Sequence, residues 1–178
     1  MLKLAIAGAG GKMGGRILAL ASNDKDVEGV AVFESPAHTL VGKKISFRSS
    51  EIEIFDSAAK VLPLCDVLID FTSPEATLKN LEVAASLKKP VVIGTTGFDE
   101  LGKKKISGIA SVIPVVFSPN MSVGVNLLFR LVEMASRVLD GRGYDTEVVE
   151  LHHNLKKDSP SGTAIKLAEI VQHSSSDD

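Results

Sequence analysis

Short apolar runs alternate with longer amphipathic segments along the first two thirds of the chain. Most of the runs are nearly continuous Val, Ile and Leu, which is typical of strands covered by helices on both faces. They predict strands over 2–8, 27–34, 52–55, 66–72, 90–96 and 113–119. The intervening segments predict helices over 12–22 and 99–111, a third opening at Ser73-Pro74, and a loop over 35–50. This alternation predicts a doubly wound, parallel α/β sheet.

The pattern changes near residue 121. The remaining sequence predicts a long amphipathic helix, a strand of mixed polarity and a further helix, over 122–139, 144–153 and 161–172. We therefore expect two domains, one over 1–121 and a small α+β domain over 122–178. The first of these helices has an apolar surface larger than one short strand and one helix can cover, so we expect this part to self-associate or to remain mobile.

Composition is that of an ordinary soluble globular protein. Of the 178 residues, 44% are hydrophobic and 24% are charged, and the formal net charge is -2. Such a small charge argues against binding to nucleic acid or to a membrane surface. No apolar run approaches the ~20 residues that span a bilayer, and the first residues do not resemble a signal peptide. Cys65, the single cysteine, predicts a buried core thiol in a cytoplasmic protein and excludes an internal disulfide.

A glycine-rich turn, GAGGKMGG (8–15), joins the first predicted strand to the first helix. Gly8, Gly11 and Gly14 are spaced three apart, where the strict dinucleotide motif has G-x-G-x-x-G. Glycines allow a tight turn and a close approach to a pyrophosphate, which the amides of the helix N-terminus then bind. Glu34 ends the second strand twenty residues after Gly14, where an acid binds ribose hydroxyls. The turn therefore favours a Rossmann-type dinucleotide site over a purely structural role.

Two later loops, GTTG (94–97) and SPNMS (118–122), follow predicted strands. The carboxyl ends of parallel strands meet at one edge of the sheet, and ligands bind at that edge. Small residues and backbone amides there suit a nicotinamide and its ribose. Each loop alone is equally compatible with an ordinary turn, and the shared edge favours the site.

The stretch ELHHNLKKDSPSGTA (150–164) concentrates groups that bind anions and donate protons. In a strand, the adjacent His152 and His153 point to opposite faces, so both serve one pocket only where the strand ends. Without a nearby cysteine, a zinc site is not expected. Histidines on the surface without a role remain an alternative.

The end of this stretch, DSPSGTA, predicts a helix start. Ser159 would cap the helix and Pro160 would occupy its first position, which leaves the amides of 161–163 as donors. A carboxylate at these amides is favoured by hydrogen bonds and by the helix dipole. Lys156 and a histidine would neutralise a second carboxylate. The stretch thus suits a small dicarboxylate beside a reducing nucleotide.

Five strings resemble, in order and spacing, motifs of the 4-hydroxy-tetrahydrodipicolinate reductase family, also called dihydrodipicolinate reductases. They are AGAGGKMG, DFTSPEAT, IGTTGF, SPNMSVGVN and ELHHNLKKDSPSGTA, the last of which is highly specific. The resemblance implies reduction of 4-hydroxy-tetrahydrodipicolinate to tetrahydrodipicolinate by NADH or NADPH, in the diaminopimelate route to lysine.

The resemblance also implies a role for each motif. His152 and Lys156 would donate protons to a substrate that receives a hydride. The substrate would be held by His153, Ser161, Gly162 and Thr163. The cofactor would contact Gly8, Ala9, Gly10, Gly11, Lys12, Met13, Glu34, Gly94, Thr95, Thr96, Ser118, Pro119, Asn120 and Met121. No metal is implied.

Three features depart from the family pattern. Lys12 stands where members often have Arg, and Ser35 stands where some have an Arg for the 2′-phosphate of NADP. Members also continue well beyond residue 172 and form homotetramers. We therefore expect an incomplete second domain that does not support the family's tetramer, and NADH binding with weak or absent turnover. One alternative is therefore a non-catalytic dinucleotide-binding protein or an inactive form of the reductase. Another is a Rossmann dehydrogenase for an amino or hydroxy acid, which His152, Lys156 and the 161–163 segment disfavour.

Overall fold

The computed structural model describes residues 1–152, 154 and 159–174. The chain divides into two compact units, Met1–Ser118 and Pro119–Asp178. Within the described residues, every helix is too short or too polar to cross a bilayer.

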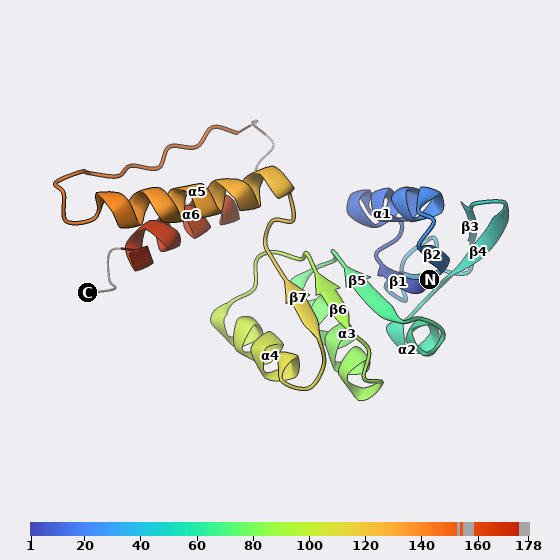
Figure 1. Cartoon of the computed structure of the whole chain (residues 1–178). Coiled ribbons are helices and arrows are strands. Elements are labelled where there is room, and N and C mark those ends of the chain that lie inside the picture. The colour runs from blue at the N-terminus through green and yellow to red at the C-terminus, as the bar shows by residue number, and fades with distance from the viewer. Residues whose placement is uncertain (153, 155–158, 175–178) are drawn as a thin grey trace. The chain divides into compact units, whose positions relative to one another are not determined.

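The first unit is built on one twisted sheet with the strand order β3-β4-β2-β1-β5-β6-β7 (Figure 1). All neighbouring strands are parallel except β3, which pairs antiparallel with β4. The strands are β1 (Leu2–Ala7), β2 (Val27–Phe33), β3 (Lys44–Phe47), β4 (Ser50–Phe55), β5 (Val67–Asp70), β6 (Val91–Ile93) and β7 (Val115–Phe117). The predicted doubly wound α/β sheet is confirmed.

The helices of this unit follow the strands in chain order. They are α1 (Lys12–Asn23), α2 (Ala58–Val61), the short 3-10 helix η1 (Leu62–Leu64), α3 (Pro74–Ser86) and α4 (Glu100–Ala110). Helix α3 begins as the sequence predicts, with Pro74 in its first turn and the Ser73 hydroxyl accepting from the Ala76 amide at 3.4 Å. Asp99 caps α4 in the same way, accepting from the Gly102 amide at 2.7 Å.

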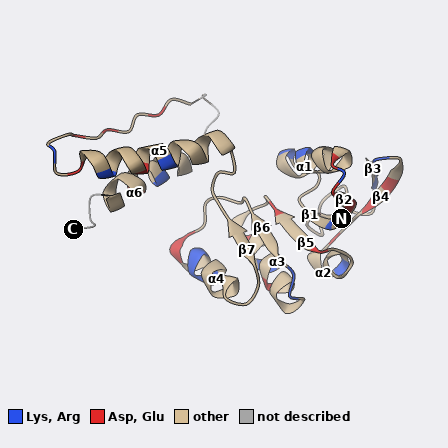
Figure 2. Ribbon diagram, viewed as in Figure 1, with Lys and Arg blue, Asp and Glu red and all other residues tan. Residues whose placement is uncertain are grey.

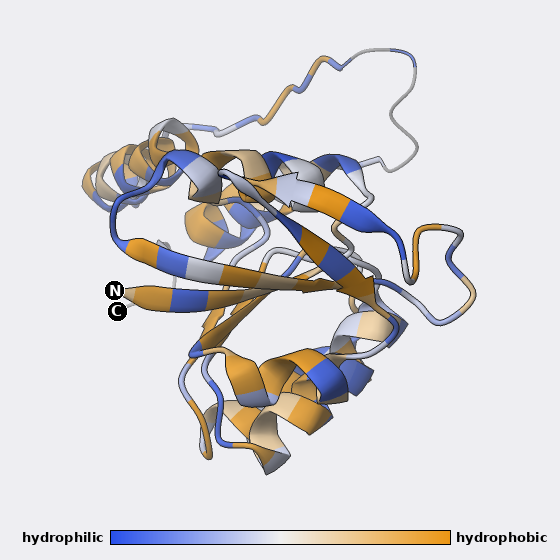
Figure 3. Ribbon diagram, turned by 90° about the vertical axis from the view of Figure 1, so that its right-hand side faces the viewer, coloured by the Kyte–Doolittle hydropathy of each residue, from blue (hydrophilic) through white to orange (hydrophobic). Residues whose placement is uncertain are grey.

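Alternate residues of the central strands bury opposite faces of the sheet. On β1, Leu4 and Ile6 belong to a core cluster that includes Leu18 of α1, whereas Ala5 and Ala7 belong to a second cluster. That second cluster also contains residues of α2, α3 and α4, and Figures 1 and 3 show α1 on one face of the sheet and these helices on the other. Burial on both faces explains why the strands are nearly continuous apolar runs.

Two predictions about local structure are wrong. The segment predicted as a loop over 35–50 contains β3, which forms a hairpin with β4 through a turn where Arg48 has φ 54°. Residues 144–152 form no strand, although the sequence predicts one over 144–153. A strand requires a partner, and the described residues of the second unit contain no other strand.

The second unit contains α5 (Val123–Leu139) and α6 (Gly162–Ser174), which pack side by side (Figure 1). On α5, Glu133 pairs with both Arg130 and Arg137, at 2.9 and 3.0 Å. Figure 2 shows that most of the α5 ribbon consists of residues other than Lys, Arg, Asp and Glu. A large part of the apolar surface of α5 is exposed, as the sequence pattern predicts; it includes Val123, Leu127, Leu128, Leu131, Met134 and Val138.

Candidate functional site

The predicted cofactor residues of the first unit lie at the carboxyl edge of its sheet. In register, Ala7 of β1 pairs with Phe33 of β2 on one side and with Asp70 of β5 on the other. The chain leaves β1 toward β2 and later returns to β5, so the strand order reverses between β1 and β5. Ligands of open α/β sheets bind in the crevice at such a reversal.

The glycine-rich turn has a geometry that only glycine permits at two positions. Gly8 has φ +69°, in the region that L side chains rarely adopt. A Cβ on Gly14 would lie 2.1 Å from the Gly8 carbonyl oxygen, so α1 approaches the end of β1 too closely for any side chain. The predicted reason for these glycines, a tight turn with close helix–strand packing, is therefore present.

The amides of the turn divide into two groups. Those of Gly8, Gly10 and Gly11 donate within the protein, to the Phe33 carbonyl at 2.9 Å, the Glu34 carboxylate at 2.7 Å and the Gly8 carbonyl at 2.9 Å. The first backbone bond of α1 runs from the Gly15 amide to the Gly11 carbonyl, so the amides of 12–14 have no acceptor within the helix. Gly11 offers no side-chain cap. These residues fit a pyrophosphate at the first turn of α1.

Glu34 directly follows β2 and has two neighbours that the sequence did not indicate. A Cβ on Gly10 would lie 2.7 Å from Leu40, 3.1 Å from His38 and 3.2 Å from the Glu34 carboxylate. The segment after β2 therefore lies directly against the glycine-rich turn. No local pattern marks His38 or Leu40, because their proximity depends on how this loop folds back.

The 94–97 loop is held closely at the end of β6. The Gly94 amide donates to the Asp70 carbonyl at 2.9 Å, and a Cβ on Gly94 would lie 1.9 Å from the Phe71 ring. Thr95 is buried, whereas Thr96 is exposed. Ser118, at the end of the neighbouring strand β7, donates its amide to the Ile93 carbonyl at 3.2 Å. The structure thus places Gly94, Thr95, Thr96 and Ser118 at neighbouring strand ends.

In the second unit, the loop that continues from Ser118 lies near the start of α6. Asn120 donates its amide group to the Thr163 hydroxyl at 3.4 Å, and the nearest atom to a Cβ on Gly162 would be Pro119 Cβ at 3.9 Å. Met121 is exposed. The structure therefore brings two separately predicted sets together, Pro119 to Met121 with Gly162 and Thr163.

The Glu150 carboxylate contacts both the start of α6 and His152. One of its carboxylate oxygens accepts from the Ser161 amide at 2.8 Å, and the other lies 2.7 Å from His152 Nε2. The Ser161 hydroxyl, rather than that of Ser159, accepts from a helix amide, that of Ala164 at 3.0 Å. The prediction that Ser159 caps the helix is therefore wrong. The Ser161 amide, predicted as a donor for a ligand, already binds Glu150.

Two predicted residues, His153 and Lys156, lie outside the described part of the chain. Of the predicted catalytic pair, the structure therefore places only His152, whose side chain is 41% exposed. Its contact with Glu150 is the feature that the sequence analysis missed. Glu150 and His152 are two positions apart in the string ELH, and such a spacing brings side chains to the same side of an extended segment.

The Glu150 contacts predict an unusual titration. Hydrogen bonds from Ser161 and then from His152 lower the pKa of Glu150 from 4.5 to about 2. A carboxyl with a lowered pKa stabilises the fold above its unfolded value, and this contribution is lost as the pH falls through the folded value. We expect the arrangement to persist below pH 4.5 and to be lost near pH 2. Carbon NMR of the Glu150 carboxyl, assigned with Glu150→Gln, measures this; a midpoint at 4.5 would contradict it.

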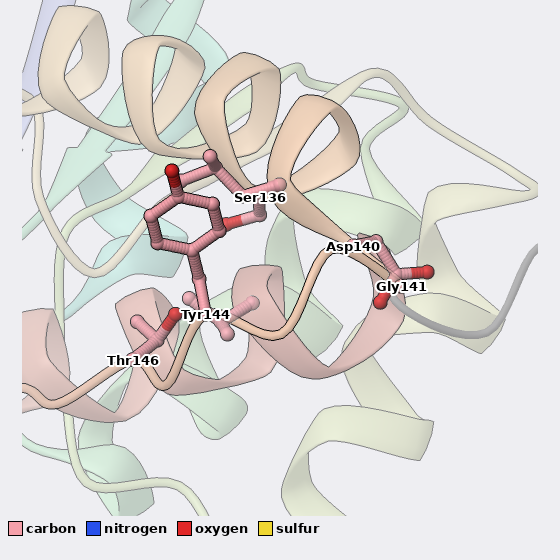
Figure 4. Close-up of a pocket in the computed structure, with 7 residues that line it drawn as sticks. Ser136, Asp140, Gly141, Tyr144 and Thr146 are labelled. Atoms are coloured by element: carbon pink, nitrogen blue, oxygen red, sulfur yellow. The ribbon is translucent and has the colours of Figure 1, made fainter.

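A small pocket lies between the end of α5 and α6, in the second unit (Figure 4). Its lining consists of Ser136, Leu139, Asp140, Gly141, Tyr144, Thr146 and Val171. Asp140 is the one carboxylate among these residues, and the lining contains no basic side chain that would bind an acidic substrate. The pocket is separate from the residues predicted for substrate and cofactor.

Comparison with known families assigns both parts of the chain. The family model described as "Dihydrodipicolinate reductase, N-terminus" matches residues 2–121, and the one described as "Dihydrodipicolinate reductase, C-terminus" matches residues 124–178. The chain belongs to the dihydrodipicolinate reductase family. The predicted family resemblance is therefore confirmed, and it extends over both units.

Individual members of the dihydrodipicolinate reductase family support the assignment. The chain is 45% identical over 175 residues to the 4-hydroxy-tetrahydrodipicolinate reductase of Citrifermentans bemidjiense, covering 96% of this chain and 65% of that protein. It is 44% identical over 180 residues to the enzyme of that name from Thiobacillus denitrificans, covering 99% of this chain and 67% of that protein. The chain thus spans about two thirds of the length of these relatives.

A solved structure of the dihydrodipicolinate reductase family has the same fold. The dipicolinate-bound enzyme from Paenisporosarcina sp. TG-14 matches with a TM-score of 0.77 and 28% identity, covering 99% of this chain and 67% of that one. An aspartate semialdehyde dehydrogenase II from Vibrio cholerae matches with a TM-score of 0.52 at 17% identity, over 79% of this chain and 47% of that one. The second likeness concerns the fold alone.

Proposed function

We propose that this chain reduces 4-hydroxy-tetrahydrodipicolinate to tetrahydrodipicolinate with NADH or NADPH. The observation that supports this most strongly is membership of the dihydrodipicolinate reductase family over both units, residues 2–121 and 124–178. The geometry of the glycine-rich turn supports the nucleotide half of the proposal, since Gly14 and Gly8 leave no space for a side chain between α1 and β1.

The first unit would bind the nucleotide at the carboxyl edge of its sheet. Amides of 12–14 would bind the pyrophosphate, and Glu34 would bind the adenosine ribose. Gly94, Thr95, Thr96 and Ser118 would line the nicotinamide side. Pro119, Asn120 and Met121, at the start of the second unit, would also contact the cofactor. When bound, the reduced nicotinamide supplies a hydride.

The second unit would bind the dicarboxylate and supply the proton. His152 would donate it, with Lys156 as a second cationic group, because a protonated imidazole can act as a general acid. Glu150 would hold the imidazole through Nε2, at the observed 2.7 Å, and stabilise its cationic form. Gly162 and Thr163 at the α6 start, with Ser161 and His153, would bind a substrate carboxylate.

A second function, dinucleotide binding without turnover, is favoured by one contact in the second unit. The Ser161 amide, which would bind a substrate carboxylate, already donates to the Glu150 carboxylate at 2.8 Å. Substrate would then have to bind at the remaining amides or displace Glu150. Mixing the purified chain with reduced nucleotide and the cyclic substrate separates the two functions, because only the first consumes the nucleotide.

The cofactor preference is a separate prediction. The Glu34 carboxylate suits a free ribose diol and repels a 2′-phosphate, and Ser35 provides no guanidinium for that phosphate. Lys12 offsets the repulsion only in part. We therefore expect NADH to bind at least as tightly as NADPH in calorimetric titrations of both.

A matched variant tests the cause of this preference. Glu34→Gln removes the charge and retains the size, so it should raise the affinity for NADPH relative to NADH. A wild-type preference for NADPH of tenfold, about 1.4 kcal/mol, would show that the phosphate contacts lie elsewhere.

A further inference from the structure

Asp70 is a fully buried carboxylate at the end of β5, outside the residues proposed to bind nucleotide or substrate. One of its oxygens accepts from the Thr72 amide at 3.0 Å, the Thr72 hydroxyl at 2.6 Å and the Thr77 hydroxyl at 2.9 Å. The other accepts from the Asn80 side-chain amide at 2.8 Å. Four donors from the β5–α3 loop and from α3 therefore converge on one side chain.

The charge of Asp70 is costly at this position. Burying an ionised carboxylate without a partner is strongly unfavourable, and hydrogen bonds have to offset the loss of hydration. Among the described ion pairs, none includes Asp70, so neutral donors alone surround it. An apolar residue of similar volume at this strand end would avoid the cost of removing a charge from water. The arrangement therefore calls for a role that packing alone does not supply.

The hydrogen bonds have a direction that follows from the number of protons. A threonine hydroxyl has one proton, and the Thr77 proton is best placed on the Asp70 carboxylate, an acceptor only. The Oγ1 atoms of Thr77 and Thr95 lie 2.7 Å apart, and both residues are buried. Since the Thr77 proton is engaged, the short contact with Thr77 is made by the Thr95 proton, whose other acceptors, the Asp70 carboxylate and carbonyl, both lie farther away at 3.5 Å. The chain Thr95 to Thr77 to Asp70 thus fixes the orientation of a residue in the 94–97 loop.

A second contact connects Asp70 to the glycine-rich turn. The Thr72 hydroxyl donates to Asp70, and the Thr72 methyl group would lie 2.9 Å from a Cβ on Gly8. The Asp70 main chain takes part as well, since its carbonyl accepts from the Gly94 amide at 2.9 Å. Asp70 therefore contacts, directly or through one threonine, both loops that face the strand-order reversal.

We propose that Asp70 is a positioning residue for the nicotinamide half of the dinucleotide. Through Thr77 it holds Thr95 and the 94–97 loop, and through Thr72 it holds the start of the glycine-rich turn. This inference rests on the proposed nucleotide binding and adds to it the residue that fixes the distance between the two loops. The adenosine half lies near Glu34, on the other side of β1, and does not depend on Asp70.

Thr77→Val tests the proposal, because it removes the hydroxyl that joins Thr95 to Asp70 while keeping the shape of the side chain. NADH affinity should fall about tenfold, the size expected for a lost hydrogen bond to a charged group. ADP-ribose, which lacks only the nicotinamide ring, should bind as it does to the wild type. Calorimetry measures both, and Thr146→Val, an exposed threonine in the second unit, is the control for a lost hydroxyl.

A charge-swap pair tests the hydrogen-bond pattern itself. Asp70→Asn places an amide nitrogen against the amide nitrogen of Asn80, so NADH affinity should fall about tenfold or more. Adding Asn80→Asp restores a donor opposite an acceptor and keeps the total charge. The double variant should therefore regain most of the NADH affinity, with ADP-ribose affinity unchanged throughout.

The outcomes distinguish this inference from the proposed function. If the wild type binds neither NADH nor ADP-ribose, the proposed nucleotide binding fails. If the wild type binds both and Thr77→Val retains full NADH affinity, or loses affinity for both ligands equally, the positioning role is overturned. Failure of Asn80→Asp to rescue a folded Asp70→Asn, as judged by thermal melting, would overturn it as well.

Discussion

Gly14→Ala should weaken nucleotide binding by about 100-fold or more and destabilise the first unit. The added Cβ would lie 2.1 Å from the Gly8 carbonyl oxygen, 2.7 Å from the Gly8 carbonyl carbon and 2.9 Å from Ala9 Cα. All three are backbone atoms, so no side-chain rotation relieves the overlap, and α1 has to move away from β1. We expect unfolding to become easier by about 3 kcal/mol, the upper part of the range for overpacking.

The effect on binding follows from the same displacement. The amides of 12–14 would move with α1 and would no longer face the pyrophosphate together with Glu34. We expect NADH affinity to fall by about 100-fold or more, equivalent to about 2.7 kcal/mol, in a calorimetric titration.

Gly15→Ala is the matched control for Gly14→Ala. A Cβ on Gly15 would have Ala9 O at 3.5 Å as its nearest neighbour, an ordinary contact. Alanine also favours the helix by roughly 0.8–1.0 kcal/mol over glycine. This variant should therefore melt at the wild-type temperature or above and bind NADH normally. Equal behaviour of the two variants would contradict the close approach of α1 to β1.

His152→Ala should lower kcat by about 100-fold or more and leave NADH affinity unchanged, because a general acid acts on the chemical step. His152 lies in the second unit and contacts Glu150 there at 2.7 Å, so its loss does not affect the glycine-rich turn. Lys156→Ala should lower kcat to a similar extent for the same reason. Steady-state rates and calorimetric NADH titrations together measure both parts of this prediction.

His173→Ala provides the control for a lost histidine. His173 is exposed near the end of α6, where its Nδ1 contacts the Glu169 carbonyl at 2.7 Å. We expect this variant to keep wild-type kcat. A loss of NADH affinity in His152→Ala, with kcat per bound nucleotide unchanged, would mean that His152 has a structural role.

Features that depend on neighbouring residues could be predicted from the sequence. Continuous Val and Ile runs predicted strands buried on both faces, and Ser73-Pro74 predicted the start of α3. The spacing of Gly8 and Gly14 predicted the close turn because both residues belong to one strand–turn–helix unit. In each case the residues that indicate the feature belong to the same strand, turn or helix as the feature itself.

Features that depend on pairing between distant segments could not be predicted. The strand expected over 144–153 has suitable residues, but no partner strand occurs among the described residues of its unit. Asp70 was visible only as an acid within an apolar run, since its partners Thr77, Asn80 and Thr95 are distributed over α3 and the loop after β6. An acidic residue in an otherwise apolar strand is the one signal that would have indicated such a network.

The choice of capping residue at α6 illustrates a further limit. The string DSPSGTA contains two serines, and the rule for a proline in the first helical position selects Ser159. In the structure the capping residue is Ser161, which is buried. Its amide donates to Glu150, eleven residues earlier in the chain. Local preferences thus restricted the helix start to a few residues, and the contact with Glu150 decided among them.

The most direct test of the proposed function is the absorbance of reduced nicotinamide on mixing the purified chain with NADH and freshly prepared cyclic substrate. We predict a loss of absorbance that requires substrate, is about 100-fold slower in His152→Ala and is unchanged in His173→Ala. Calorimetry on the same preparation establishes whether NADH is bound. Bound NADH with no substrate-dependent loss of absorbance would contradict the proposed reductase activity and would leave a dinucleotide-binding protein without turnover.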